Sequence, residues 1–124
     1  MRVSITGSRG LTVSHADISA HLPAAASVIV SGGASGVDSV AASYARSQGI
    51  TLSVIRPDYS GSAHARLAPL DRNSEIIAQA DYCLFFFDGV SRGTNDTIAK
   101  AVKAGKHGKV IVIGSCVRDS VIRF

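Results

Sequence analysis

Five short runs of apolar residues, mostly β-branched or aromatic, are the feature of this sequence that most constrains its fold. Their hydrophobicity is nearly continuous rather than alternating, which is typical of strands buried on both faces and therefore of a parallel sheet. The runs are Val3–Thr6, Val28–Ser31, Leu52–Ile55, Tyr82–Phe87 and Val110–Ile113. Segments of helical pattern separate them, so we expect an α/β domain with right-handed crossovers.

The helical segments are defined by apolar residues spaced three and four apart, which form one face of a helix. The clearest begins near Ser35, and its apolar face is Val37, Val40, Ala41, Tyr44 and Ala45. The others are expected at Ser14–Leu22, Asn73–Gln79 and Thr94–Ala104. Arg56–Asp71 reads as a surface loop, and the tail after Ile113 reads either as a short extra strand or as a docking segment.

The length of 124 residues indicates one domain, residues 1–124, and the 46% hydrophobic content is enough for a core. No apolar run approaches the roughly 20 residues needed to cross a bilayer. The first residues enter a strand pattern directly, without the apolar stretch of a signal peptide. We therefore expect a cytoplasmic protein with no membrane partner.

The cysteines and histidines give no metal-binding pattern, so we expect no metal and read Cys83 and Cys116 as buried thiols of a reduced protein. The net charge is +4. The densest basic stretch is Lys100, Lys103, Lys106, His107 and Lys109. Two interpretations remain open for it: a solvated helix end with a compensated dipole, or a patch for an anion or a nucleic acid.

Three strands end in loops that carry glycines and hydroxyls: TGSRG (Thr6–Gly10), SGGASG (Ser31–Gly36) and DGVSRGT (Asp88–Thr94). The carboxyl ends of parallel strands share one edge of the sheet, where ligands bind. Backbone N–H groups, helix N-termini and the guanidinium groups of Arg9 and Arg92 are suited to a phosphate. We therefore interpret the glycines as allowing a phosphate-bearing ligand to approach the main chain. The spacing fits neither the Walker pattern nor GxGxxG, so no cofactor is expected beyond a nucleotide-type ligand.

These loops, together with DRNSEII and AKAVKAGK, resemble the SLOG superfamily of Smf- and LOG-like Rossmannoid domains, and most closely its stand-alone branch related to YspA and YpsA. The resemblance covers about residues 1–113 and implies a nucleotide or nucleotide-derived ligand over the strand ends. It also implies a homodimer or a higher homo-oligomer. The residues it implies at the site are Gly7, Ser8, Arg9, Gly32, Gly33, Gly36, Asp38, Arg72, Asn73, Ser91, Gly93 and Thr94.

The third loop departs from the pattern of the LOG enzymes, PGGxGTxxE, whose glutamate serves the cleavage of a base–ribose bond. Here the leading proline is absent and Thr97 stands at the glutamate position. Asp96, one residue earlier, points about 100° away on a helix. This departure argues against LOG chemistry, although Asp88 and Asp96 are the carboxylates we would name as catalytic.

Several single residues have both a structural and a functional interpretation. For Asp38 there are three interpretations: it compensates a helix dipole, it accepts a hydrogen bond from a loop N–H, or it accepts a hydrogen bond from a ribose hydroxyl. Arg72 and Asn73 cap a helix start or reach a phosphate or base edge, and Asp88 forms a turn or acts at the crevice. The same choice applies to Glu75, Tyr59 and His64.

The sequence therefore predicts a three-layer Rossmann-like fold, with a parallel five-stranded sheet in the order 3-2-1-4-5 and helices on both faces. The favoured function is a module that binds or senses a phosphate-bearing nucleotide ligand. The alternatives are a nucleoside 5'-monophosphate N-glycosidase (a phosphoribohydrolase) and Smf-like binding of single-stranded DNA.

Overall fold

The computed structural model describes residues 1–56, 68–113 and 120–124. From the first strand to the fifth, strands and helices alternate along the chain as the apolar pattern predicts. In chain order they are β1 (Arg2–Gly7), α1 (His15–His21), β2 (Val28–Ser31), α2 (Val37–Gln48), β3 (Thr51–Val54), α3 (Ala68–Gln79), β4 (Tyr82–Phe87), α4 (Arg92–Lys103), β5 (His107–Val112) and β6 (Ser120–Arg123).

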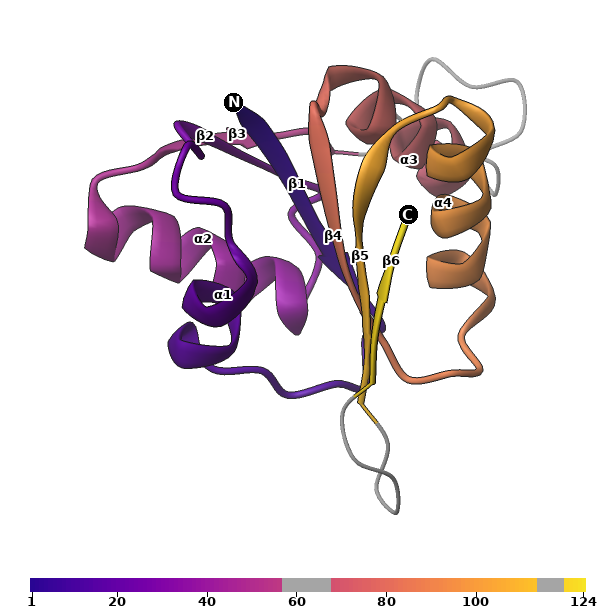
Figure 1. Ribbon diagram of the computed structural model, residues 1–124, viewed down its shortest axis with the longest axis horizontal. Coiled ribbons are helices and arrows are strands. Elements are labelled where there is room, and N and C mark those ends of the chain that lie inside the picture. The colour runs from indigo at the N-terminus through magenta and orange to yellow at the C-terminus, as the bar shows by residue number, and fades with distance from the viewer. Residues whose placement is uncertain (57–67, 114–119) are drawn as a thin grey trace.

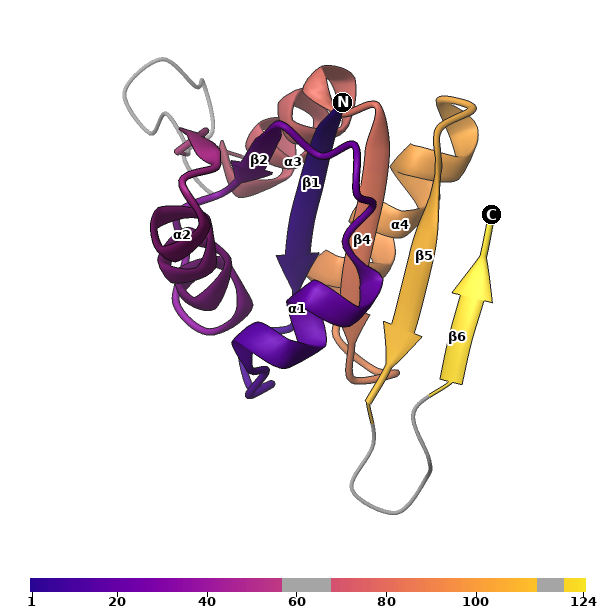
Figure 2. The ribbon, with the colours of Figure 1, turned by 60° about the vertical axis from the view of Figure 1, so that its left-hand side comes forward.

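The strands form one sheet in the order β3-β2-β1-β4-β5-β6. The first five are parallel in the predicted order 3-2-1-4-5, which confirms the Rossmann-like α/β fold. To these five parallel strands β6 adds a sixth, antiparallel to β5, with Lys109 opposite Arg123 (Figure 2). Ser120–Arg123 of the tail thus form an edge strand, and a short extra strand is one of the two interpretations that the sequence left open.

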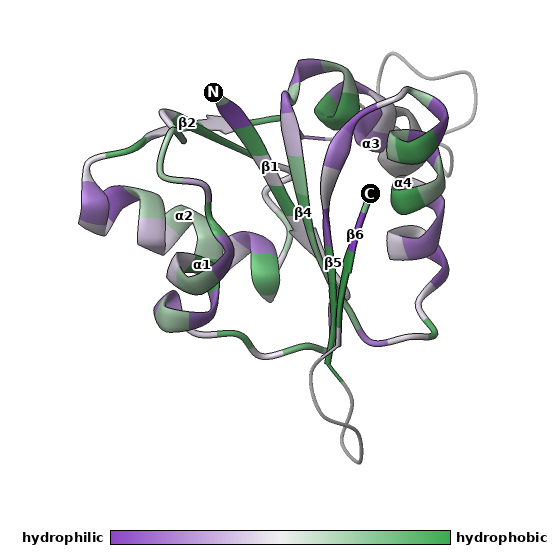
Figure 3. Cartoon of the chain, in the orientation of Figure 1, coloured by the Kyte–Doolittle hydropathy of each residue, from purple (hydrophilic) through white to green (hydrophobic). Residues whose placement is uncertain are grey.

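Helices cover both faces of the sheet, with α1 and α2 on one side and α3 and α4 on the other (Figure 1). Phe85 and Phe86 are both fully buried. Because successive side chains of a strand point to opposite faces, each phenylalanine anchors a different layer, and burial of such a side chain stabilises by about 1.5–3 kcal/mol. Phe86 packs in the cluster with Ile5 and Ala41, and Phe85 packs with Ala101. Figure 3 shows green and purple residues on α4, as expected for a helix with one apolar face.

Element boundaries differ from the prediction by a few residues. α3 begins at Ala68, five residues before the predicted Asn73. Its second residue is Pro69, and proline is tolerated in the first turn because the N–H groups there have no partner within the helix. β5 begins at His107 rather than Val110, because polar residues at its start still pair with β4.

β1 lies between β2 and β4, so the strand order reverses beside it. The chain leaves β1 toward α1 on one face and leaves β4 toward α4 on the other (Figure 1). In open α/β sheets this divergence opens a crevice at the carboxyl ends of the strands. The fold therefore places the loops after β1 and β4 at the position where such proteins bind ligands.

Candidate ligand-binding site at the carboxyl edge of the sheet

A cavity of about 440 Å³ lies at this crevice. Its wall comes from the end of β1, the start of α2, the middle of α3 and the segment from the end of β4 into α4. The lining residues are Thr6, Gly7, Arg9, Gly10, Ala34, Asp38, Arg72, Asn73, Ile76, Asp88, Ser91, Gly93, Thr94 and Thr97. The three glycine-bearing loops of the sequence thus each contribute to one cavity.

Three hydroxyl groups join the loop after β1 to the start of α4. Ser8, only 2% exposed, has its Oγ 2.9 Å from Ser91 Oγ and 3.2 Å from Thr94 Oγ1. Ser91 Oγ donates to Thr94 Oγ1 at 3.0 Å, and Ser8 Oγ accepts from the Asp88 N–H at 3.2 Å. Buried polar groups need such partners, so this hydroxyl cluster fixes the two loops relative to each other.

Asp88 shapes the turn between β4 and α4. Its Oδ1 accepts from the N–H groups of Val90 at 2.9 Å and of Ser91 at 2.8 Å. These two hydrogen bonds lower the pKa of the Asp88 carboxyl below its ordinary value. The turn-forming interpretation of Asp88 therefore accounts for its position, and the carboxylate also lines the cavity.

The N-terminus of α4 opens onto the cavity without a side-chain cap. Ser91 is the N-cap residue, but its hydroxyl accepts no hydrogen bond from the first turn, which also holds no acidic residue. Gly93 and Thr94 of that turn line the cavity. The first N–H groups of a helix carry partial positive charge and have no partner within the helix, so they favour an anion here.

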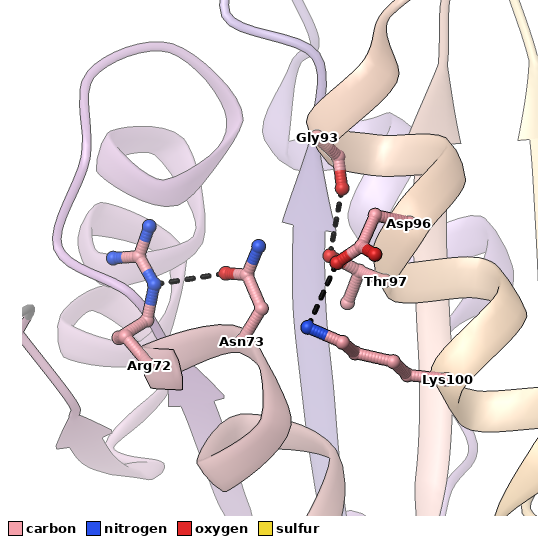
Figure 4. A network of polar contacts seen from close by, with 6 residues as sticks. All are labelled: Arg72, Asn73, Gly93, Asp96, Thr97 and Lys100. Atoms are coloured by element: carbon pink, nitrogen blue, oxygen red, sulfur yellow. Dashed lines mark hydrogen bonds and ion pairs between the residues drawn. The ribbon is translucent and has the colours of Figure 1, made fainter. Parts of the chain in front are cut away.

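Arg72 reaches from α3 to the end of β2. Its Nη1 donates to the Gly32 carbonyl at 2.6 Å, and its Nε donates to Asn73 Oδ1 at 2.9 Å. Both side chains are seen in Figure 4. The guanidinium group is held in place from two sides while Arg72 still lines the cavity. It therefore supports the wall and supplies positive charge to it.

Asp38 is 8% exposed in the first turn of α2, and its Oδ2 accepts from the Ala34 N–H at 3.1 Å. Of its three interpretations, acceptance from a loop N–H is the one the geometry shows. Burial raises the pKa of the Asp38 carboxyl, while the Ala34 hydrogen bond and the charges of Arg72 and Arg9 act in the opposite direction. Arg9 itself is exposed and lines the cavity.

The glycines of the second loop face the protein's own atoms rather than the cavity. A Cβ on Gly32 would lie 2.5 Å from Arg72 Nη1, and one on Gly36 would lie 2.9 Å from the Arg9 carbonyl oxygen. Gly36 also has a φ of 75°, which residues with a side chain rarely adopt. Close packing between loops thus explains these glycines, whereas the sequence suggested approach of a ligand.

Most of the predicted site residues line the cavity, but six of them do not. Ser8, Gly32, Gly33, Gly36, Arg92 and Asp96 are absent from its wall. Arg92 is exposed on the first turn of α4. Asp96 is not among the lining residues and forms an ion pair with Lys100 at 2.9 Å, shown in Figure 4. Catalytic roles for Asp88 and Asp96 remain predictions.

Five lining residues were not predicted as site residues: Thr6, Gly10, Ala34, Ile76 and Thr97. Thr6 and Gly10 begin and end the first glycine-bearing segment, Ala34 lies within the second, and Thr97 occupies the position of the LOG glutamate, so these four carried a signal. Ile76 carried none, because an apolar residue on a helix reads as core.

Other predictions from the sequence concern residues elsewhere. Tyr59, His64 and Cys116 lie outside the described residues. Cys83 is buried as a free thiol. Within the described ranges, no group of three His, Cys, Asp or Glu residues lies close enough to hold a metal. In the same ranges, no helix combines the length and apolar character needed to span a membrane.

The fold and the cavity together define a Rossmann-like α/β domain with a polar crevice at its strand switch point. A family model described as "YspA, cpYpsA-related SLOG family" matches residues 1–61. This match places the N-terminal half of the chain, which holds the first two glycine-bearing loops, in the SLOG superfamily, in its branch related to YspA and YpsA, and confirms the resemblance of those two loops. A comparison with curated proteins finds no match.

The packing of Gly36 against the Arg9 carbonyl predicts that a side chain at this position destabilises the fold. We expect Gly36→Ala to lower the free energy of unfolding by about 2 kcal/mol or more, because it combines an unfavourable φ with a close backbone contact. Gly10→Ala is the matched control: its Cβ meets nothing within 4 Å, so its stability should be unchanged or slightly higher. Urea denaturation measures both, and equal stability of the two variants would contradict the packing.

The hydrogen bonds of the Asp88 carboxylate predict how the stability of the fold depends on pH. Its pKa is lowered on folding, so the carboxylate stabilises the fold above the unfolded pKa of about 3.9, and this contribution is lost as the pH falls through the folded value. Asp88→Asn keeps an acceptor oxygen but no charge. We expect the variant to be less stable than the wild type at pH 7, with a gap that closes toward pH 2. A gap independent of pH would refute the role given to the charge.

Proposed function

We propose that the protein binds a nucleotide or a nucleotide-derived ligand, with a phosphate group at the rim of the cavity, and that it acts as a ligand-binding or sensing module. Membership of the SLOG superfamily suggests a domain for a nucleotide-related ligand. The cavity volume of about 440 Å³ lies within the roughly 300–1,000 Å³ typical of small-molecule sites.

One observation carries this proposal: the same cavity wall holds Arg9, Arg72 and the uncapped start of α4. Guanidinium groups donate to phosphate oxygens in a forked geometry, and a helix N-terminus favours negative charge. The Thr94 hydroxyl, which accepts from Ser91, adds a polar group beside that helix start. A phosphate bound here would interact with all three kinds of group.

The site gives less support to N-glycosidase chemistry. Such a reaction needs a carboxylate that stabilises an oxocarbenium-like state. At the position of the LOG glutamate, Thr97 donates its hydroxyl to the Gly93 carbonyl at 2.9 Å. The neighbouring Asp96 is paired with Lys100. Asp88 and Asp38 do line the cavity, but both carboxylates already accept hydrogen bonds from loop N–H groups. We therefore propose ligand binding without turnover.

Binding of single-stranded DNA also lacks its usual surface among the described residues. Such proteins stack bases on exposed aromatic side chains along a basic groove. The described aromatic residues, Tyr44, Tyr82, Phe85, Phe86, Phe87 and Phe124, are all buried or partly buried. The basic stretch noted in the sequence is divided between the end of α4 and the start of β5.

The first test is mass spectrometry of the small molecules released when the purified protein is denatured. We expect an intact phosphate-bearing nucleotide derivative. The purified protein is then incubated with a panel of nucleoside monophosphates, for which we expect binding by calorimetry and no release of free base. Absence of any released ligand together with absence of binding across the panel would refute the proposal, and release of free base would show an N-glycosidase.

Removal of one guanidinium group tests the placement of the phosphate. Arg9→Ala should weaken binding of the recovered ligand about tenfold, the effect of one exposed charge-assisted hydrogen bond, with little loss of stability. Arg46→Ala is the matched control, because it removes an equal charge from the exposed last turn of α2, away from the cavity. Equal affinities of the two variants, measured by calorimetry, would show that the phosphate binds elsewhere.

A further inference from the structure

β6 forms one end of the sheet, and no described element pairs with its outer side (Figure 2). All of its residues are exposed, so no helix covers either face of the strand. Its two central side chains are nevertheless apolar: Val121 is 42% exposed and Ile122 is 56% exposed. An edge strand of this kind can accept a further strand from a binding partner.

The free hydrogen-bonding groups of this edge belong to the main chain of Val121 and Arg123. The N–H groups of Gly108 and Phe124 each donate to the carbonyl of the other residue at 3.1 Å, so these two residues form a hydrogen-bonded pair between β5 and β6. In an antiparallel ladder, every second residue bonds to the neighbouring strand. Ile122, two residues before Phe124, therefore also bonds to β5. The N–H and C=O groups of Val121 and Arg123 point away from the sheet, where a further strand would pair with them.

One face of this edge carries like charges. Lys109 of β5 lies directly opposite Arg123, so both side chains stand on the same face of the sheet. Among the described residues, no carboxylate forms an ion pair with either of them. His107, two residues before Lys109, is exposed on the same face. Like charges opposite each other in a sheet are destabilising, so this face favours a partner that brings negative charge.

The other face of the edge is apolar. Ile122 lies opposite Val110, which packs in the same cluster as Phe85 and Ala101 of the α4 side. Side chains alternate along a strand, so Ile122 stands on this face and Arg123 on the other. A strand that paired with β6 would meet cations on one face and an apolar side chain on the other.

We propose that the open edge of β6 is a docking site for an extended acidic segment of a partner protein, in which carboxylate and apolar side chains alternate. The main chain of this segment pairs with that of Val121 and Arg123. Its carboxylates lie beside Arg123 and Lys109, and its apolar side chains cover Ile122. No residue of β5 or β6 lines the cavity, so this inference is independent of the proposed function.

A second copy of β6 fits this edge less well than an acidic segment does. Symmetric antiparallel pairing of two copies would place Arg123 and Lys109 of both copies on one face of a continuous sheet. Cations would then face cations, whereas an acidic segment neutralises them. The charge of the edge therefore discriminates against self-association.

The test uses three seven-residue peptides with blocked ends. In the first, three glutamates alternate with two valines between terminal threonines. The second has lysine in place of each glutamate, and the third has the composition of the first with its glutamates consecutive. Calorimetry at low salt should show that the wild type binds the first peptide about tenfold more tightly than the second. It should bind the first about fivefold more tightly than the third, which keeps the charge but loses the alternation.

Charge reversal at the edge tests which residues recognise the peptide. Arg123→Glu should abolish the preference for the glutamate peptide over the lysine peptide. Lys109→Glu combined with Arg123→Glu should reverse that preference. Arg46→Glu makes the same charge change in the last turn of α2, over the other end of the sheet (Figure 1), and should leave the preference unchanged.

A proline at the edge tests the main-chain pairing. Val121→Pro removes an outward N–H group without removing a hydrogen bond to β5. It should weaken binding of the first peptide about fivefold, the effect of one hydrogen bond, and should leave the unfolding temperature nearly unchanged. Val121→Thr keeps the N–H group and should bind the peptide as the wild type does.

Any of four outcomes would overturn the inference. The first is that the wild type binds none of the peptides, or binds all of them equally. The second is equal affinity for the first and third peptides, which would show attraction of charge without strand pairing. The third is an unchanged preference in Arg123→Glu. The fourth is a dimer in sedimentation experiments that Val121→Pro dissociates, which would show that a second copy occupies the edge.

Discussion

The buried hydroxyl of Ser8 is the point on which the geometry of the cavity depends. It accepts from the Asp88 N–H and lies within hydrogen-bond distance of Ser91 and Thr94, so one side chain at the end of β1 positions both the turn after β4 and the first turn of α4. Because the Ser91 and Thr94 hydroxyls bond within this cluster, no side chain caps the helix. In the proposed function, this uncapped helix start is the group that favours negative charge in the cavity.

The opposite wall is built by close packing around the second glycine loop. Arg72 lies against Gly32, where any Cβ would collide with the guanidinium group, and Gly36 lies against the Arg9 carbonyl. These contacts fix the two arginine-bearing segments at the rim. The loop most suggestive of phosphate binding in the sequence therefore acts as a support, while Gly10 and Gly93, which have open space around them, line the cavity.

The sequence predicted the strand order and the edge at which the loops meet, because continuous apolar runs and glycine-bearing strand ends are local signals. It left β6 undecided, because a four-residue edge strand has too short a pattern to distinguish from a tail. It placed Arg9 at the site through the loop after the first strand, and Arg72 and Asn73 through a resemblance to a family. It missed Thr6 and did not separate lining residues from supporting ones, since that distinction depends on which face of a strand or loop turns toward the cavity.

Amide NMR during a titration with AMP tests the central claim most directly, namely that the phosphate of a nucleotide-type ligand binds at the α4 start and the loop after β1. The account predicts that the N–H signals of Gly10, Gly93 and Thr94 shift most, with a common dissociation constant, and that those of Gly33 and Gly36 shift little. Shifts concentrated at Gly33 and Gly36, or on the β5 and β6 edge, would contradict it.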